Sequence, residues 1–456
     1  MKRKLSSSTD ESTESFARKS NICAFHTSHF SNHDSEDDEK LIAISGIRKK
    51  LLSWYDSSKR TLPWRTLASE SSSDNNQRGY GIWISEVMLQ QTQVATVIDY
   101  YNRWMGSWPT VTDLASANLD SINRLWSGLG YYSRAKRLLE GAVKVVNEFD
   151  GLFPSTVEGL RKIPGVGQYT ACAVASIAYN CPVGVVDGNV VRVLTRLKAI
   201  GKDSSSKEVM DLLWRVANEL VDPERPGDFN QSLMELGATI CTPKNPSCKV
   251  CPLKDECAAL KEISSLHQYD IEDCHLCIRD YDKAKGVMNY PVKLKKTKVR
   301  DAVSEVIIIR TPTTSRYLLF QRPSIGLLAN LYEFFSIPSK DETRNSSVNE
   351  LYRVLRDDAG IECSSLQYIG EVFHQFSHIS QTYKVWSCTS LAEEEDDLSP
   401  KLKAGNYQSF LLMGTAEDVQ SSSISTAMKK VLRLYQKQSM EPPKKQKRIT
   451  SFFTTK

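Results

Sequence analysis

Long apolar segments are missing from this sequence of 456 residues. No run approaches the ~20 apolar residues that span a membrane, and the opening residues, MKRK, lack the apolar core of a secretory signal. The chain also has no strong charge imbalance, because it contains 59 Lys and Arg and 54 Asp and Glu. We therefore expect an intracellular protein with no membrane partner, and charge alone gives only weak support for a polyanionic partner.

Disulfides do not explain the cysteine content of an intracellular protein. The chain has 11 cysteines, and reducing compartments disfavour disulfides, so these residues suggest metal ligands where their spacing agrees. Hydrophobic residues make up 40% of the chain. This content and length are enough for two or three domains with their own cores.

Composition divides the chain into five segments. Residues 1–40 and 436–456 are polar and poor in apolar side chains, so we expect disordered tails there. Helical periodicity runs through residues 41–260 without a series of alternating strands, which predicts an all-α domain. Residues 261–298 form a polar connector. Residues 299–435 change to strand-like apolar runs with one helix, which predicts a separate α+β domain.

A short helix, the turn PGVG at residues 164–167 and a second helix predict a hairpin that can hold a phosphate. Ser155 and Glu158 have the spacing of a capping box, which predicts the start of the first helix. Gly165 and Gly167 lack Cβ atoms, so a phosphodiester can approach the amides that open the second helix. The alternative, of equal weight for this turn alone, is an ordinary Pro-Gly turn between packed helices.

Two carboxylates occur in apolar surroundings. Glu86 interrupts the apolar side of a helix predicted over residues 82–105, and desolvation there would let it hold a proton near neutral pH as a general acid. Asp187 follows a valine-rich run, in the sequence VDGN. The alternatives are a surface glutamate and a helix N-cap. One carboxyl group as acid and a second that stabilises an oxocarbenium ion are the general arrangement for glycoside cleavage.

Four cysteines give the sharpest signal in the chain. They follow the pattern C-x6-C-x2-C-x5-C, at Cys241, Cys248, Cys251 and Cys257. Four thiolates at such close spacing predict a metal centre. Zinc accepts four thiolates, but this spacing is unusual for zinc and favours an iron-sulfur cluster.

The hairpin, the VDGN sequence and the four-cysteine loop together resemble the helix-hairpin-helix, iron-sulfur DNA glycosylases. Within that superfamily, SEVMLQQT at residues 85–92 and GLGYYSR at residues 128–134 resemble the MutY-type adenine DNA glycosylases. The match spans most of residues 41–435 with the motifs in the same order. The resemblance implies one 4Fe-4S cluster and a base-excision-repair enzyme for double-stranded DNA. That enzyme flips out adenine mispaired with 8-oxoguanine and hydrolyses it from its sugar, with guanine as a second candidate partner base.

The resemblance also assigns roles to single residues. Glu86 would protonate the adenine ring, and Asp187 would stabilise the sugar cation. Tyr169 and Asn189 would assist them. DNA contacts would come from the hairpin, from two side chains that fill the duplex around the extruded base, and from one arginine: Gly165, Val166, Gly167, Gln91, Tyr131 and Arg134.

The chemistry of adenine removal distinguishes the two carboxylates. Adenine leaves poorly as an anion, so Glu86 should be protonated and Asp187 ionised, and their environments should push their pKa values apart. The family's strand-cutting relatives have a lysine at the position of Tyr169, and a phenol cannot form their Schiff base. We therefore expect a monofunctional glycosylase. Two alternatives stay open: a bifunctional glycosylase-lyase of the endonuclease III kind, and a non-catalytic DNA-damage scaffold bound to the sliding clamp.

The connector holds a candidate zinc site. His267, Cys274 and Cys277 follow the order H-x6-C-x2-C, and in animal members of the family a zinc site there takes three cysteines and a histidine from the N-terminal region. His267 stands where the first cysteine would be, and histidine also ligates zinc. His29 is the expected fourth ligand, with His33 next. A flexible linker with an incidental Cys-x-x-Cys is the alternative.

The α+β segment resembles the Nudix-like C-terminal domain of the same family. Residues 306–309 and 317–320 predict strands, and residues 351–358 predict a helix. The sequence RVLRDDAGI keeps the glycine and an acidic pair of the Nudix hydrolase motif but loses the glutamate after the arginine. That loss disfavours metal-dependent nucleotide hydrolysis.

The family uses this domain to read 8-oxoguanine, and its Phe-Ser-His loop matches Phe376, Ser377 and His378. The resemblance implies that Phe376 wedges between bases while Ser377 and His378 offer hydrogen bonds. The alternative for the phenylalanine and the histidine is packing at the end of a strand.

The C-terminal tail contains QKRITSFF, which matches the peptide that docks on the replication sliding clamp. One helical turn would bring its apolar side chains onto one face. The matching residues are Gln446, Ile449, Phe452 and Phe453. Neighbouring basic residues suit import into the nucleus, with the mitochondrion as a second candidate location. Two further candidate partners are the checkpoint clamp and an abasic-site endonuclease.

Overall fold

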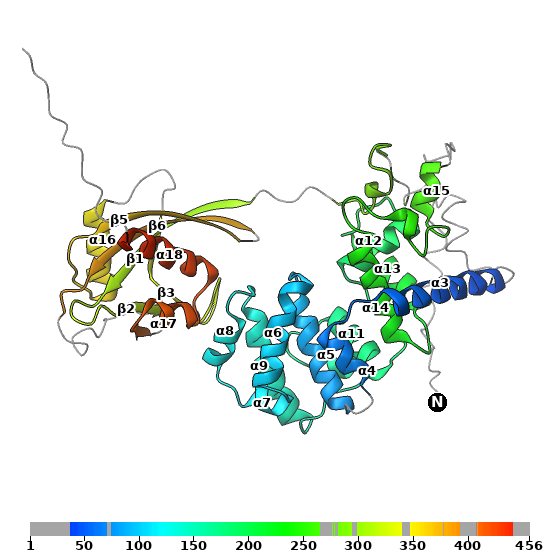
Figure 1. The fold of residues 1–456 in the computed structure, drawn as a ribbon, viewed down its shortest axis with the longest axis horizontal. Helices are drawn as coiled ribbons and strands as arrows, with labels where there is room; N and C mark the ends of the chain where they lie inside the picture. Colours follow the sequence, from blue (N-terminus) through cyan, green and yellow to red (C-terminus); the bar gives the residue numbers. More distant parts are fainter. Residues whose placement is uncertain are drawn as a thin grey trace, which may run out of the picture. The chain divides into compact units, whose positions relative to one another are not determined.

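The computed structural model describes residues 37–70, 74–264, 276, 278, 281–293, 299–339, 347–376, 378–392, 407 and 409–440. The described residues fall into two compact units. The first is bounded by Met1–Gln91 and Lys144–Lys296, and the second by Thr92–Val143 and Thr297–Lys456. Figure 1 shows the ribbon of both units, with labels on many of their helices and strands.

The described part of the first unit is helical. Its helices are α3 (Asp37–Ser58), α4 (Pro63–Ser69), α5 (Asn75–Leu89), α10 (Val157–Leu160), α11 (Gln168–Tyr179), α12 (Gly188–Leu197), α13 (Lys207–Leu220), α14 (Pro226–Thr239) and α15 (Ala258–Ser264), with short 3-10 helices η1 (Cys248–Val250) and η2 (Gly286–Asn289). Aliphatic side chains of α3, α12, α13 and α14 form one large core, which includes Leu51, Leu194 and Leu213. Among the described helices, none is both long and apolar enough to cross a membrane.

Two helices of this unit are buried around most of their circumference. All residues of α5 from Gly79 to Met88 are buried, and so are most residues of α11. Such helices pack inside a domain instead of at its surface. Gly79 on α5 leaves room for the Tyr179 side chain of α11, because a Cβ atom there would be 2.0 Å from the Tyr179 hydroxyl oxygen. A carboxyl group on α5 is therefore withdrawn from water.

The helix predicted over residues 82–105 is interrupted. α5 ends at Leu89 and α6 begins at Val94, and the chain turns between them. Gln91 in this turn has a φ of 57°, a left-handed conformation that ends helical geometry. Because the apolar periodicity continues from α5 into α6, the sequence pattern alone could not locate the turn between them.

The helix predicted to begin at a capping box with Ser155 and Glu158 has a different N-cap. Thr156 caps α10, and its side-chain oxygen accepts a hydrogen bond of 3.2 Å from the Gly159 amide. The capping-box prediction is wrong by one residue, because Thr156 is an equally good N-cap type at the adjacent position.

The second unit begins with four helices, α6 (Val94–Ser107), α7 (Val111–Ala115), α8 (Leu119–Trp126) and α9 (Ser133–Glu148), the last of which ends in the first unit. Their apolar faces meet around tryptophans. Trp104 packs edge to face against Trp126, with ring centroids 5.5 Å apart, and both are fully buried. Trp126 also holds the loop between α8 and α9, because its indole N–H donates to the Gly130 carbonyl at 2.9 Å.

The C-terminal part of the second unit is built on a mixed sheet. Its strands are β1 (Arg300–Arg310), β2 (Tyr317–Gln321), β3 (Tyr332–Glu333), β4 (Phe335–Pro338), β5 (Gln367–Gln375), β6 (Ile379–Thr389) and β7 (Phe410–Met413). The order is β3-β2-β1-β6-β5, while β4 pairs with β1 and β7 with β2. β1 and β6 run parallel, and the remaining pairs are antiparallel.

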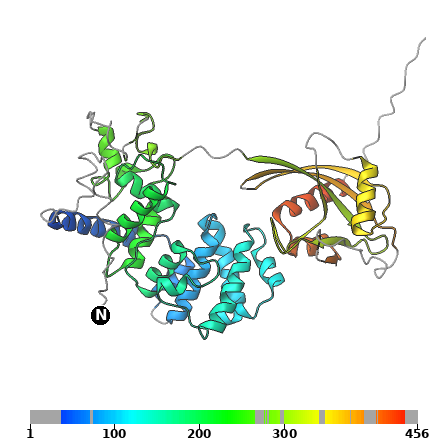
Figure 2. The same cartoon turned by 180° about the vertical axis from the view of Figure 1, so that it is seen from behind.

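Helices cover both faces of this sheet (Figure 2). Successive residues of a strand point to opposite faces, so Val306 and Ile308 pack with α17 (Ala416–Ser421) and α18 (Thr426–Met440). Ile307 and Ile309 pack with α16 (Val348–Val354) and the π-helical turn η3 (Leu355–Ala359). A strand buried on both faces reads as a continuous apolar run, as it does here.

The predicted fold class is confirmed. Every described element between residues 41 and 260 is a helix, and the segment after residue 299 combines strands with helices. The strands predicted at residues 306–309 and 317–320 lie within β1 and β2. The helix predicted at residues 351–358 divides into α16 and η3, and Gly360, with a φ of 67°, follows the end of η3.

Candidate active site

Glu86 is the buried carboxyl group of α5. Its side chain is only 5% exposed, and it accepts a hydrogen bond of 2.7 Å from the hydroxyl of Tyr169 at the start of α11. Burial raises the pKa of Glu86 to about 7; the Tyr169 hydrogen bond acts against this rise, and the nearby negative charge of Asp187 adds to it. A carboxyl group with this pKa can donate a proton near neutral pH, as a general acid must.

Asp187 is the N-cap of α12. One carboxylate oxygen accepts the amides of Val190 at 2.7 Å and Asn189 at 2.9 Å, and the other accepts the side-chain amide of Asn189 at 2.8 Å. Burial raises the pKa of Asp187, while these three hydrogen bonds favour the ionised form and oppose the rise. Asp187 is thus a helix cap, as one of the two sequence interpretations predicted, and its carboxylate is also preorganised by fixed donors.

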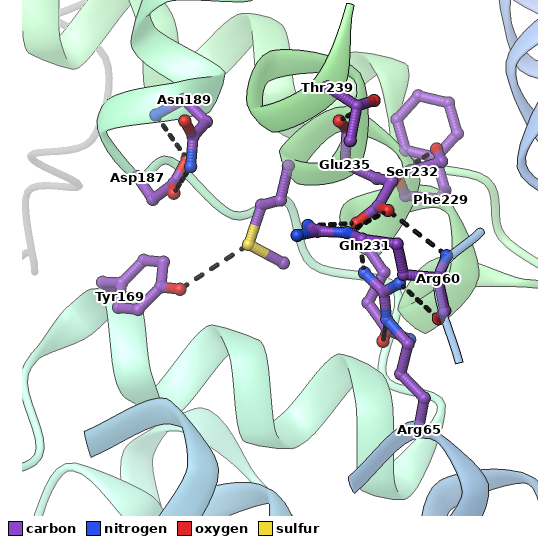
Figure 3. A network of polar contacts seen from close by, with 11 residues as sticks. Arg60, Arg65, Tyr169, Asp187, Asn189, Phe229, Gln231, Ser232, Glu235 and Thr239 are labelled. Carbon is purple, nitrogen blue, oxygen red and sulfur yellow. Dashed lines mark hydrogen bonds and ion pairs between the residues drawn. The ribbon is translucent and has the colours of Figure 1, made fainter. Parts of the chain in front are cut away.

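Tyr169 lies beside both carboxyl groups. Its hydroxyl contacts Glu86 and is 3.6 Å from the sulfur of Met234 on α14. Burial and the charges of Glu86 and Asp187 raise the pKa of Tyr169 well above its ordinary value, so the phenol stays protonated. Figure 3 shows Tyr169 below the hydrogen-bonded pair of Asp187 and Asn189. The structure therefore brings the four predicted catalytic residues into one site from α5, α11 and α12.

A second buried carboxylate, Glu235 on α14, shows what a structural carboxylate looks like in the same unit. Its oxygens accept hydrogen bonds from Arg60 at 2.6 and 2.8 Å and from Arg65 at 2.9 Å (Figure 3). Burial alone would raise its pKa, but the two guanidinium groups reverse the direction and lower it. Glu86 has a phenol as its hydrogen-bond donor and keeps the raised pKa, so the two carboxylates are set for different tasks.

Arg192 connects the predicted catalytic residues with the cysteine loop, and the sequence analysis did not identify it. Its guanidinium donates to the Asn189 side-chain oxygen at 2.8 Å, to the Gly237 carbonyl at 2.7 Å and to the Cys241 carbonyl at 2.8 Å. A Cβ atom on Gly237 would lie 2.6 Å from the Asn189 Cβ, so only glycine allows α14 to approach α12 this closely. The only sequence signal for Arg192 is its position one helical turn after Asn189.

The four cysteines of the predicted metal centre surround one cavity, together with Arg196, Leu260 and Val287. Cys241 follows α14, Cys248 opens η1, and Cys257 precedes α15. Backbone hydrogen bonds shape the loop, including Cys251 amide to Cys248 carbonyl at 3.2 Å. The sequence prediction that these four thiols share one site agrees with this arrangement.

A buried arginine, Arg196, indicates the charge of the group that would fit this cavity. Arg196 is 2% exposed and donates to the Cys241 sulfur at 3.3 Å and to the Thr242 carbonyl at 2.8 Å. A buried cation needs nearby negative charge, which deprotonated thiols would supply. Among the described residues, no group of three or more His, Cys, Asp or Glu is placed to hold a single metal ion. Four thiols are a donor set that both zinc and an iron-sulfur cluster accept.

The hairpin between α10 and α11 has an open backbone at its two glycines, and phosphate binding there stays a prediction. Gly165 has a φ of 79°, which favours glycine. Gly167 is exposed, is the N-cap of α11 without a side-chain cap, and has open space where a Cβ would be. Val166 is buried and anchors the turn, with its amide bonded to the Ile163 carbonyl at 3.1 Å. The first amides of α11 are therefore open to an anion.

Gln91 and Tyr131 are both exposed and both have left-handed backbone conformations, with φ of 57° and 47°. Tyr131 is 45% exposed at the loop between α8 and α9. Strained conformations of this kind in non-glycine residues often mark functional positions. The side chains of Gln91 and Tyr131 are thus both exposed at turns. A side chain that enters a DNA duplex needs this kind of exposure.

Arg134 lies against the loop between α8 and α9, and its contact with DNA stays a prediction. It is 6% exposed, and its guanidinium donates to the carbonyls of Leu129 at 3.2 Å and Gly130 at 3.0 Å. It also lies over the rings of Trp126 and Tyr131, at 5.1 and 5.5 Å from their centroids. Arg134 supports the loop that carries Tyr131, because its donors are turned inward to that loop's own backbone.

The predicted lesion-reading residues lie at the turn between β5 and β6. Phe376 is half-buried against His374, with ring centroids 4.6 Å apart, and its amide donates to the Ile379 carbonyl at 2.8 Å. His378 is exposed. The other predicted site residues lie outside the described part of the chain, namely Ser377, the candidate zinc ligands His29, His267, Cys274 and Cys277, and the clamp motif Gln446, Ile449, Phe452 and Phe453.

Comparisons with known proteins agree on both parts of the chain. Residues 84–219 match the HhH-GPD superfamily base excision DNA repair protein family, and residues 305–434 match the NUDIX domain family. The adenine DNA glycosylase of Mus musculus is 47% identical over 416 residues, which are 86% of this chain and 78% of the mouse protein. The adenine DNA glycosylase of Homo sapiens is 47% identical over 421 residues, which are 87% of this chain and 75% of the human protein.

Among solved structures, a thermostable thymine-DNA glycosylase resembles part of the chain. It is 26% identical, with a TM-score of 0.43, and the match covers 50% of this chain and 100% of that protein.

Proposed function

Because the chain belongs to the adenine DNA glycosylase family, whose members hydrolyse N-glycosyl bonds in base excision repair, we propose that Glu86 and Asp187 carry out adenine removal. The observation that supports this assignment best is the buried Glu86 carboxyl group, with a pKa of about 7, beside an Asp187 carboxylate held by three donors. One group is set to donate a proton, and the donors around the other favour its charged form.

In this proposal Glu86 acts on the base. Adenine is a poor leaving group as an anion, and a proton given to its ring removes that charge. Tyr169 holds the Glu86 carboxyl group through the hydrogen bond of 2.7 Å, so the proton is aimed in a fixed direction. The surrounding buried side chains of α5 exclude water from the carboxyl group.

Asp187 acts on the sugar. Loss of adenine leaves positive charge on the deoxyribose, and a fixed carboxylate lowers the energy of that charge. Asn189 keeps the Asp187 oxygens in place through its amide and its side chain, so little reorganisation is needed during the reaction. The phenol of Tyr169 stands where a Schiff-base lysine would act in a lyase, which supports hydrolysis without strand cleavage.

The helical hairpin and two exposed turns supply the proposed DNA contacts. The open amides at the start of α11 suit a backbone phosphate. Gln91 and Tyr131 are presented at turns, and side chains of this kind can fill the space left by an extruded base. A base inside a stacked duplex hides its glycosidic bond, so extrusion is required before the two carboxyl groups can act.

We further propose that Cys241, Cys248, Cys251 and Cys257 hold a 4Fe-4S cluster. Their shared cavity and the buried Arg196 beside the Cys241 sulfur support this ligand set. When bound, the cluster supplies a rigid link between four points of the loop after α14. The Cys241 carbonyl then offers a fixed acceptor for Arg192, which in turn holds Asn189.

Replacing Arg192 by glutamine is expected to slow adenine excision by about 10- to 100-fold, as is typical for residues that orient groups from a second layer. Glutamine cannot make the three contacts to Asn189, Gly237 and Cys241 at once. The measurement is the single-turnover rate constant, with iron content determined on the same sample. Arg356→Gln is the control, because the Arg356 guanidinium is exposed and donates to the side chain of its neighbour Asp357 at 3.1 Å. A normal rate in the Arg192 variant would contradict this role.

The proposed substrate is adenine opposite 8-oxoguanine, read by Phe376 and His378 at the turn between β5 and β6. The test is single-turnover cleavage of three duplexes, with adenine opposite 8-oxoguanine, guanine or thymine, analysed with and without alkali. We expect the fastest adenine loss opposite 8-oxoguanine and strand breaks only after alkali. Phe376→Ala should reduce the preference for 8-oxoguanine over guanine. Breaks without alkali would favour a lyase, and no adenine loss from cluster-loaded protein would favour a scaffold.

The tail sequence QKRITSFF supports docking on the sliding clamp, and a nuclear location belongs to the same proposal. Replacing Phe452 and Phe453 together by alanine should abolish clamp binding, because the apolar face of the motif is lost. Adenine excision from naked DNA should stay unchanged, since these residues lie far along the chain from Glu86 and Asp187. Calorimetric titration with purified clamp measures the first effect, and unaltered binding would refute the motif.

A further inference from the structure

Two cysteines of the C-terminal sheet belong neither to the active site nor to the four-cysteine loop. Cys388 is buried near the end of β6, and Cys363 is partly buried in the segment between η3 and β5. Both side chains pack in the apolar cluster that lies under α16 and η3. Neither has a role in the proposed glycosylase chemistry.

Backbone pairing brings the two cysteines onto one face. Cys363 forms an isolated antiparallel bridge with Ser390. Hydrogen bonds flank the bridge, from the Ser364 amide to the Thr389 carbonyl at 2.7 Å and from the Leu391 amide to the Glu362 carbonyl at 2.9 Å. Residues two apart along a strand point to the same side, so Cys388 shares the face of Ser390 and is the diagonal neighbour of Cys363.

The two thiols are chemically unequal. The hydrogen bond from the Cys388 thiol lowers the pKa of Cys363, although partial burial opposes this shift. The same hydrogen bond and burial raise the pKa of Cys388. Cys363 is also the more accessible of the two, so its thiolate is the better nucleophile toward a small oxidant.

We propose that Cys363 and Cys388 are a peroxide-reactive pair, in which Cys363 is oxidised first and Cys388 then closes a disulfide. The Cys363 thiolate attacks one oxygen of a hydroperoxide, the O–O bond breaks, and a sulfenic acid forms while water or an alcohol leaves. The Cys388 sulfur then attacks the sulfenic sulfur, the S–S bond forms as the S–O bond breaks, and the hydroxyl group leaves as water with the proton of the Cys388 thiol. The two thiols are oxidised, and the peroxide is reduced by two electrons.

The position of the pair determines what the bond would do. Cys363 precedes β5 and Cys388 lies one residue before the end of β6, so the disulfide would close the open end of the β5–β6 hairpin. Phe376 and His378 lie at the opposite end of this hairpin. The bond would keep β5, an edge strand, paired with β6 under conditions that otherwise loosen the sheet.

Peptide mapping of the full chain tests the proposal. Reduced protein is treated with hydrogen peroxide, free thiols are alkylated, and the digest is searched for a linked pair that has lost two hydrogen atoms. We expect the link between Cys363 and Cys388, reversal by dithiothreitol, and a rise of several degrees in the unfolding midpoint of the oxidised form. Alkylation of both thiols after peroxide treatment would overturn the proposal, and this experiment needs no variant.

Two variants separate the roles of the cysteines. In Cys388→Ala, Cys363 should accumulate as a sulfenic acid that dimedone captures, whereas the wild-type protein should yield little adduct. Cys181→Ala is the control, because Cys181 is also partly buried but lies outside the sheet, and it should leave the link unchanged. Equal dimedone labelling of Cys363 in the wild type and in Cys388→Ala would show that Cys388 does not resolve the sulfenic acid, which would also overturn the proposal.

Discussion

Replacing Asp187 by asparagine is expected to abolish adenine excision while the protein still folds and binds a mispair. The substitution removes the charge that would stabilise the sugar cation but keeps a side-chain oxygen for the amide of Val190, and asparagine is as good an N-cap as aspartate. Loss of one preorganised donor costs other enzymes about 10²–10³-fold in rate. Here a full charge is lost, so we expect a decrease of at least about 10³-fold in the single-turnover rate constant.

A cap without a catalytic role provides the matched control. Ser206 caps α13 by accepting the Val209 amide at 3.3 Å, and Ser206→Ala should lower the free energy of unfolding by about 1 kcal/mol without slowing excision. Asp187→Ala should lose both stability and activity. The Asn and Ala variants together thus separate the structural task of Asp187 from the chemical one. A wild-type excision rate in Asp187→Asn would contradict the catalytic assignment.

Local signals in the sequence were sufficient for the fold class and for the chemistry of single residues. The glutamate among apolar neighbours in residues 82–88 predicted a desolvated carboxyl group, and Glu86 is indeed buried with a raised pKa. For Asp187, the two interpretations were offered as alternatives, yet a carboxylate at a helix N-terminus can serve both, because the amides that it caps also fix its position. The burial of Glu86 and the capping by Asp187 depend mainly on residues nearby in the sequence, and a sequence pattern contains that information.

Features that depend on contacts between distant segments could not be predicted. Arg192 was missed because its importance comes from Gly237 and Cys241, which lie 45 and 49 residues away in sequence. The burial of Glu235 requires Arg60, which is 175 residues away.

The pKa values of the two carboxylates were expected to move apart. The structure shows a difference in their hydrogen-bond donors and not in the direction of the two shifts. Burial raises the pKa of both Glu86 and Asp187. The difference between them lies in their donors, since Glu86 accepts one phenol and Asp187 accepts three amide hydrogens. Counting donors requires the fold of α11 and α12, which the sequence alone did not provide.

Replacing Glu86 by glutamine is expected to slow adenine excision by about 10²–10⁴-fold, the range that general acids contribute. The wild-type rate should also depend on pH in a defined direction. Glu86 is active when protonated, so the rate should be highest below its pKa of about 7 and fall as the pH rises through that value. The decrease above this pH should approach about tenfold for each pH unit. Glutamine cannot titrate, so the pH dependence should disappear in the variant.

Tyr169→Phe provides the sharper control on this mechanism. The Tyr169 hydrogen bond lowers the pKa of Glu86, so its removal should move the midpoint of the pH profile to higher pH, in addition to any loss of rate. A purely structural role for Tyr169 would change the rate but leave the midpoint in place. Single-turnover rates measured across the pH range on duplex DNA distinguish the two. A rate that rises with pH through the midpoint would show that Glu86 acts as a base, which would contradict its assignment as the acid.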